Sequence, residues 1–88
     1  MDLKDYRQQI DRIDDELLQL FKERMAVSHQ VALYKKEHGL QTLDAARESE
    51  KLAEIGEKAG SELRPYAHTL YATILELSRL YQGSVLDL

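Results

Sequence analysis

Apolar residues recur at intervals of three and four along the first third of the chain. The series is unbroken from Leu3 to Tyr34, and neither Pro nor Gly occurs before Gly39. The seam consists of Leu3, Tyr6, Ile10, Ile13, Leu17, Leu20, Arg24, Val27, Val31 and Tyr34. This spacing predicts one long amphipathic helix, from about residue 3 to residue 37, with a heptad seam.

The predicted helix is too long for a compact monomer of 88 residues. At about 1.5 Å per residue it spans roughly 50 Å, whereas a compact chain of this length has a radius of gyration of about 12 Å. One end of the helix would project past its own domain with its apolar seam bare. We therefore expect a second copy of the chain to cover the seam in a homodimer.

Two shorter helices are expected to follow. Asp44 is a suitable N-cap for a helix over about residues 45–58, which Gly60 ends. Ser61, with Pro65 in the first turn, begins a third helix that runs to about Gln82. The apolar faces of these two helices are Leu52, Ile55 and Ala59, and Leu63, Ala67, Leu70, Ile74, Leu77 and Tyr81. The chain is thus predicted to be a single all-α domain of three helices, residues 1–88, with 83–88 as a frayed tail.

Composition narrows the possible functions. Apolar residues make up 43% of the chain, which argues against disorder, and the absence of Cys excludes disulfides and thiolate metal sites. A net charge of −4 disfavours general nucleic-acid binding. The first residues contain no apolar signal core, and no segment approaches the length of a membrane span. We expect a cytoplasmic protein that binds neither nucleic acid nor membrane.

The usual catalytic constellations are missing. There is no Gly-rich phosphate loop, and the scattered His29, His38 and His68 are interpreted as surface or loop residues rather than metal ligands. The serines have no His and Asp partners in a triad-like motif. Acid–base, nucleophilic and metal catalysis therefore lack obvious residues, and no cofactor is expected.

Polar and cationic side chains instead lie on or beside the apolar faces. They are Arg7, Arg24, Lys35, Arg47, Glu48, Ser78 and Gln82. Arg24 occupies the seam itself, where a buried charge is costly without an anionic partner, and it shares a helix face with Lys35. This set suggests a site for a small, multiply anionic ligand. The alternative is that the cations extend from the seam edges into solvent and that Glu48 pairs with a neighbouring Arg.

Arg7 cannot reach that ligand within one chain. It lies seventeen residues from Arg24, about 25 Å along a straight helix. Two copies packed antiparallel about a twofold axis near residues 17–20 would bring Arg7 of one chain opposite the Arg24–Lys35 stretch of the other. Dimerisation would then cover the seam and complete two equivalent sites.

These residues also carry a resemblance to a known family. Residues 6–24, YRQQIDRIDDELLQLFKER, resemble the opening helix of the all-helical chorismate mutases, chorismate mutase type II. Lys35 follows Arg24 by eleven residues, as the family's catalytic lysine does. Residues 44–48 match its D-x-x-R-E motif, and Ser78 with Gln82 matches its S-x-x-x-Q motif. The resemblance covers about residues 3–82.

The resemblance implies an intertwined homodimer that converts chorismate to prephenate in the shikimate pathway to phenylalanine and tyrosine. It also implies a role for each matching position. Arg7 from the partner chain and Arg24 would hold the substrate carboxylates, and Ser78 would contact one of them. Lys35 and Gln82 would donate to the ether oxygen. Glu48 and the backbone at Asp44 would bind the ring hydroxyl, and Arg47 would brace the site.

Some questions stay open at this level. Leu77 and Arg79 flank Ser78 where the family often has an acidic and an apolar residue; we expect Arg79 to point to solvent rather than to add a cation at the site rim. The chain is either a free-standing enzyme or a domain of a larger one. The alternative functions are an isochorismate pyruvate-lyase on the same fold and a non-catalytic helical dimerisation or regulatory module. Arg24 argues against the module, since its position in the seam has no evident structural benefit.

Overall fold

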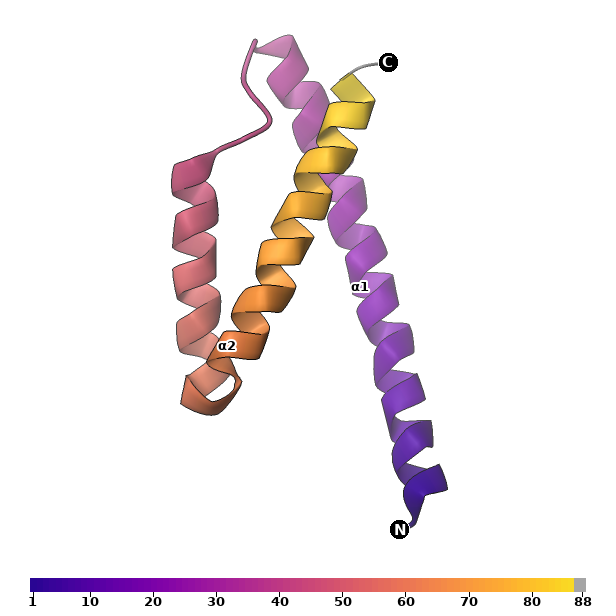
Figure 1. Cartoon of the computed structure of the whole chain (residues 1–88). Helices are drawn as coiled ribbons and strands as arrows, with labels where there is room; N and C mark the ends of the chain where they lie inside the picture. Colours follow the sequence, from indigo (N-terminus) through magenta and orange to yellow (C-terminus); the bar gives the residue numbers. More distant parts are fainter. Residues whose placement is uncertain (87–88) are drawn as a thin grey trace.

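The computed structural model describes residues 1–86, and all regular secondary structure in this range is helical (Figure 1). Helix α1 comprises Leu3–Glu37 and helix α2 comprises Ala45–Leu86. The prediction of an all-α fold is confirmed, as are the bounds of the long first helix. No helix in residues 1–86 combines the length and the apolar character needed to cross a membrane.

Local interactions determine both ends of α1. At its start, the Asp2 carboxylate accepts from the Asp5 N–H and the Asp5 carboxylate accepts from the Asp2 N–H, both at 3.0 Å. This reciprocal pair is a capping box, which satisfies two N–H groups that the helix leaves free. At the other end Gly39 has a φ of 66°, the left-handed conformation that commonly ends helices.

The prediction of three separate helices is wrong in one respect: α2 is a single element with a sharp kink. Gly60 has φ 82° and ψ 164°, which are not helical values. Helical turns resume directly after Gly60 with no intervening loop, so the two predicted helices form one kinked element. We call residues 45–59 the first arm of α2 and residues 61–86 the second arm. Pro65 lies inside α2, five residues after the kink at Gly60.

The second arm is also longer than predicted. Helix α2 continues to Leu86, so residues 83–86 are not part of a frayed tail. Val85 is only 7% exposed, and its burial gives the last turns a reason to remain helical. The final two residues of the predicted tail, 87 and 88, lie outside the described residues.

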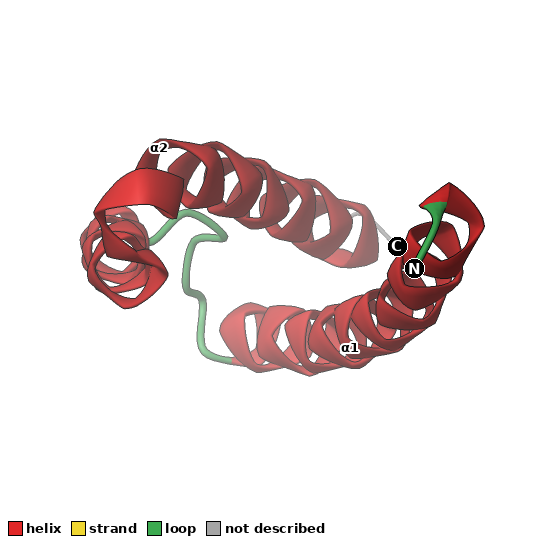
Figure 2. Cartoon of the chain, turned by 90° about the horizontal axis from the view of Figure 1, so that it is seen from below, coloured by secondary structure: helices red, strands yellow, loops and turns green. Residues whose placement is uncertain are grey.

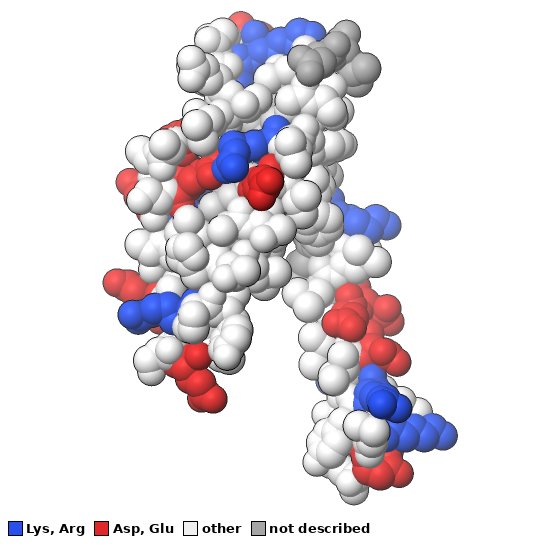
Figure 3. Space-filling view, in the orientation of Figure 1, with Lys and Arg blue, Asp and Glu red and all other residues white. Residues whose placement is uncertain are grey.

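The helices leave the chain elongated. The C-terminal half of α1 lies against the second arm of α2, whereas the N-terminal half projects beyond it (Figures 1 and 2). This projecting N-terminal half of α1 carries both acidic and basic side chains (Figure 3). The radius of gyration is 16.1 Å and the longest dimension is 54 Å, larger than the roughly 12 Å radius of a compact domain of this length.

Only a few residues of α1 and α2 are buried, and the apolar stripes remain uncovered. The buried residues are Ser28, Ala32, Gly56, Leu75, Ser78, Gln82 and Val85. Along the first half of α1, the seam residues from Leu3 to Leu20 are between 48% and 61% exposed. Leu63 and Leu70 on the second arm are likewise exposed. Within residues 1–86 no large side chain is fully buried, so one chain alone lacks a substantial apolar core.

Candidate active site

One cavity of about 640 Å³ lies between α1 and both arms of α2. Helix α1 contributes residues from Leu20 to Lys35, the connecting loop contributes Thr42 and Asp44, and both arms of α2 complete the lining. This volume falls within the range of about 300–1,000 Å³ that is typical of small-molecule sites. The cavity is therefore large enough for a metabolite-sized ligand.

Positive charge gathers in this cavity although the chain as a whole is acidic. Its cationic residues are Arg24, Lys35, Arg47, Lys51 and Arg79, and its acidic residues are Glu23, Asp44 and Glu48. The lining thus has an excess of cations, whereas the chain carries a net charge of −4. A concave surface with such a local excess attracts an anionic ligand.

Arg24 joins α1 to the second arm of α2. Its Nη1 donates to the Ser78 hydroxyl oxygen at 2.6 Å, and Ser78 is buried. Within residues 1–86 no carboxylate lies at ion-pair distance from Arg24. A guanidinium has five N–H donors, so Arg24 retains donors and an uncompensated charge for a ligand carboxylate.

Lys35 and Gln82 place two kinds of donor side by side. Lys35 Nζ donates to the backbone oxygen of Thr42 at 2.8 Å and to Gln82 Oε1 at 3.2 Å. An ammonium has three N–H donors, so one remains available. Because the Gln82 amide accepts through Oε1, its Nε2 group is left as a donor. Gln82 is only 8% exposed, which restricts the movement of this amide.

The N-terminus of α2 borders the same cavity. Asp44 Oδ1 accepts from the Arg47 N–H at 3.0 Å, which confirms the predicted N-cap. The Asp44 carbonyl accepts from the Glu48 N–H, also at 3.0 Å. This cap fixes the first turn, from which both Arg47 and Glu48 line the cavity. The partial positive charge of a helix N-terminus adds to the local preference for anions.

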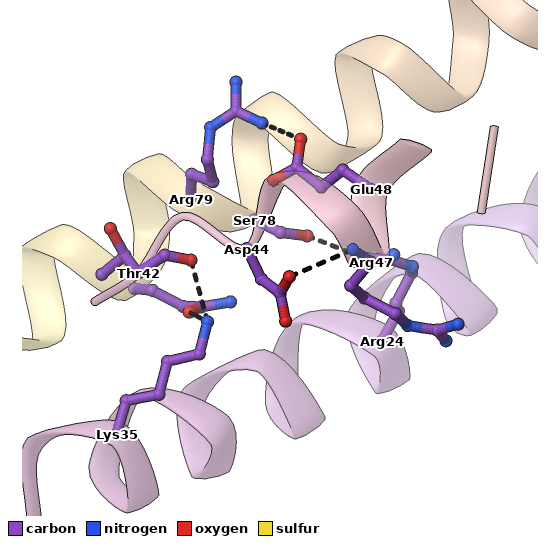
Figure 4. A network of polar contacts seen from close by, with 9 residues as sticks. Arg24, Lys35, Thr42, Asp44, Arg47, Glu48, Ser78 and Arg79 are labelled. Atoms are coloured by element: carbon purple, nitrogen blue, oxygen red, sulfur yellow. Dashed lines mark hydrogen bonds and ion pairs between the residues drawn. The ribbon is translucent and has the colours of Figure 1, made fainter. Parts of the chain in front are cut away.

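Arg79 lies in the site, and the expectation that it points to solvent is wrong. Arg79 Nη1 forms an ion pair with Glu48 Oε1, and both residues line the cavity (Figure 4). Their side chains are 33% and 21% exposed, respectively. Glu48 and Arg79 are 31 positions apart in the chain, and the kink at Gly60 between them folds the second arm back beside the first. A tertiary contact of this kind has no signal in local spacing.

Seven of the eight predicted site residues line this one cavity. They are Arg24, Lys35, Asp44, Arg47, Glu48, Ser78 and Gln82. Arg7 does not line it, because Arg7 lies on the projecting half of α1. Sequence reasoning missed Glu23, Thr42 and Lys51. Lys51 could have been found, since it follows Arg47 by four residues on the same helical face, whereas Thr42 participates through its backbone oxygen, which no side-chain pattern reveals.

The three histidines lie outside the cavity lining. His38 caps the end of α1, with its ring stacked on Tyr34 at a centroid distance of 4.0 Å. His29 lies with its ring centroid 6.1 Å from that of Tyr81. In the part of the chain that the structure describes, no group of three or more His, Cys, Asp or Glu residues is arranged to hold a metal ion.

An exposed ion pair on the first arm of α2, between Lys58 and Glu54, shifts the pKa of both groups. Lys58 Nζ donates to Glu54 Oε1 at 2.5 Å, and this hydrogen bond, followed by the charge of Lys51, lowers the pKa of Glu54. The same hydrogen bond raises the pKa of Lys58. Neither Glu54 nor Lys58 lines the cavity. Exposed pairs contribute little to stability, so we assign this pair no part in the site.

Together, the fold and the cavity define a class: an all-helical protein with a cavity rich in cationic side chains, formed by residues of α1, the loop and both arms of α2. Residues 6–83 match the sequence profile of chorismate mutase type II, and the chain belongs to this family. The match confirms the resemblance carried by the helical motifs. Comparisons with curated proteins and with solved structures give no match.

Proposed function

We propose that the protein is a chorismate mutase that rearranges chorismate to prephenate in aromatic amino acid biosynthesis. The observation that carries the proposal is the pairing of Lys35 with Gln82 in the same cavity as Arg24. The reaction is a concerted intramolecular rearrangement, so it requires no base, nucleophile or metal. The protein must hold the extended ether in its compact reactive conformer and stabilise charge that develops on the ether oxygen.

The geometry supports a role for each side chain. Lys35 has one remaining N–H and Gln82 has its Nε2 group, and we assign both to the ether oxygen of the breaking bond. Arg24, whose charge has no carboxylate partner within residues 1–86, binds a substrate carboxylate with the help of the Ser78 hydroxyl.

The remaining assignments concern the ring hydroxyl and the second carboxylate. Glu48 and the backbone at Asp44 bind the hydroxyl, since both lie at the start of α2 beside the cavity. Arg47 braces this turn from the same helix end. Arg7 of a second chain supplies the last cation, because Arg7 of the same chain lies outside the cavity.

The uncovered seam of α1 supports a homodimer. Its residues are about half exposed, as are Leu63 and Leu70 on the second arm. Burial of apolar surface stabilises an association by about 25 cal/mol per Å², and a second copy in antiparallel orientation would cover both stripes. The same arrangement would carry Arg7 of each chain toward the other chain's cavity.

The decisive experiment is a turnover assay with purified protein, chorismate and no added cofactor. We expect chorismate absorbance to fall as prephenate forms. A parallel assay with isochorismate tests for pyruvate and salicylate, the products of the lyase alternative. Turnover of isochorismate alone would replace the mutase with the lyase, and turnover of neither substrate would favour the non-catalytic module.

A further inference from the structure

The ion pair between Arg79 and Glu48 is the one contact between charged side chains that the structure places inside the cavity, among residues 1–86. It joins the first arm of α2 to the second. Arg79 directly follows Ser78, which is itself held by Arg24. The base of the Arg79 side chain therefore starts from a buried and hydrogen-bonded part of the helix.

The pair uses only part of the hydrogen-bonding capacity of Glu48. Arg79 contacts Oε1, and no hydrogen bond or ion pair from residues 1–86 reaches Oε2. An ionised carboxylate accepts through both oxygens, so Oε2 remains free to accept from a ligand hydroxyl. Glu48 has several rotatable bonds, and restricting them before the ligand arrives removes an entropic cost from binding.

We infer that Arg79 is a positioning residue whose ion pair with Glu48 Oε1 holds the carboxylate so that Oε2 accepts the ring hydroxyl of the substrate. This inference rests on the proposed function, which assigns that hydroxyl to Glu48. Arg79 acts through Glu48 and does not touch the reacting atoms. It therefore contributes to recognition of the ring hydroxyl rather than to the bond rearrangement.

Arg64 offers a matched control for a purely structural role. Arg64 also links the two arms of α2, since its Nε donates to the Gly56 carbonyl oxygen at 3.1 Å. It does not line the cavity that contains Glu48. Replacement of either Arg by Met keeps an unbranched apolar stem and removes the charge and the N–H donors. Only the Arg79 replacement should alter recognition of the ring hydroxyl.

The experiment compares chorismate with an analogue in which hydrogen replaces the ring hydroxyl. We expect Arg79→Met to lower kcat/KM for chorismate about tenfold, the usual scale for loss of one charge-assisted contact. The change should lie mainly in KM, because the hydroxyl is bound in the ground state and the transition state alike. For the analogue we expect less than about a twofold change. Arg64→Met should affect both substrates equally.

A double-mutant cycle with Glu48→Gln tests whether Arg79 acts through Glu48. Once the carboxylate is gone there is nothing for Arg79 to position, so Glu48→Gln/Arg79→Met should be no slower than Glu48→Gln alone. Arg79→Lys should restore part of the lost activity, since an ammonium keeps the charge without the planar fork. Thermal unfolding of each variant shows whether the fold is retained.

Three results would overturn the inference while leaving the mutase intact. The first is an equal loss with both substrates, which would assign Arg79 to the fold or to another part of the substrate. The second is full additivity with Glu48→Gln. A gain in activity for Arg79→Met would also contradict it, because Arg79 would then compete with the substrate for Glu48. If the unaltered protein does not turn over chorismate, the proposed function fails first and this inference fails with it.

Discussion

Lys35 Nζ lies 3.2 Å from Gln82 Oε1, although the two residues are 47 positions apart in the chain. Lys35 stands in the last turn of α1, and Gln82 lies near the end of α2. The contact depends on the second arm of α2 running back along α1. It places a cationic donor and a neutral donor at one point of a cavity otherwise rich in carboxylate-binding groups.

Replacement of Lys35 by Ala should remove most of the chorismate turnover. Loss of one preorganised donor at developing negative charge lowers kcat by about 10²–10³-fold. Lys36→Ala is the matched control, because Lys36 is the adjacent, exposed lysine of the same helix and does not line the cavity. Steady-state kinetics measure both variants. Undiminished turnover by Lys35→Ala, with the association state intact, would refute the assignment of Lys35.

The rate should vary little between about pH 6 and pH 8. A neutral Gln needs no proton to donate at the ether oxygen, and no His, the side chain that ordinarily titrates in this interval, lines the cavity within residues 1–86. A kcat profile across these pH values checks the prediction. A steep loss of turnover on going from pH 8 to pH 6 would contradict the role given to Gln82.

Two inactive variants should complement each other if Arg7 acts across chains. In a mixed dimer of Arg7→Ala and Lys35→Ala subunits, one site receives Arg7 from one chain and Lys35 from the other, while the second site lacks both. Random assortment makes half the dimers mixed, so about a quarter of the unaltered activity should return. The assay follows turnover after the two variants are unfolded together and refolded.

The same mixture distinguishes a contribution of Arg7 within one chain. If each chain supplied its own Arg7, no mixed dimer would contain an intact site, and the activity would stay at the average of the two variants. Each variant refolded alone is the control. Full activity of Arg7→Ala by itself would remove Arg7 from the site altogether.

Two glycines of α2 should respond in opposite directions to replacement by Ala. Gly60 has φ 82° and ψ 164°, and a Cβ there would meet nothing within 4 Å, so the cost of Gly60→Ala is conformational, about 1–3 kcal/mol. Gly83 has open space and lies inside the helical second arm, so Gly83→Ala should stabilise by up to about 1 kcal/mol. Thermal or urea unfolding measures both, and a stabilised Gly60→Ala would contradict the kink.

Much of the fold could be predicted because its signals are local. The seam of α1 is unbroken and Gly39 follows it, so both helix bounds were predictable. The break at Gly60 was predictable from the same kind of signal. The predicted tail from Gly83 is wrong: a glycine within a helix is unfavourable by about 1 kcal/mol relative to Ala, but burial of Val85 two residues later keeps the chain helical there.

For the same reason, only those residues of the candidate site that share one helix face could be grouped from the sequence. Arg24 and Lys35 share one helical face, which helical spacing alone reveals. The position of Arg79 beside Glu48 depends on how the two arms of α2 cross, and spacing within either arm contains no information about that crossing. Arg7 lies outside the cavity of its own chain, so an Arg7 side chain could reach this cavity only from a second chain.

The central claim is that two chains share each site, and the most direct measurement is the mass of the protein in solution at the concentration used for turnover. Light scattering coupled to size exclusion, with activity assayed across the peak, makes that measurement. We predict a particle of twice the chain mass that carries all the chorismate mutase activity. A particle with the mass of a single chain and full activity would contradict the account.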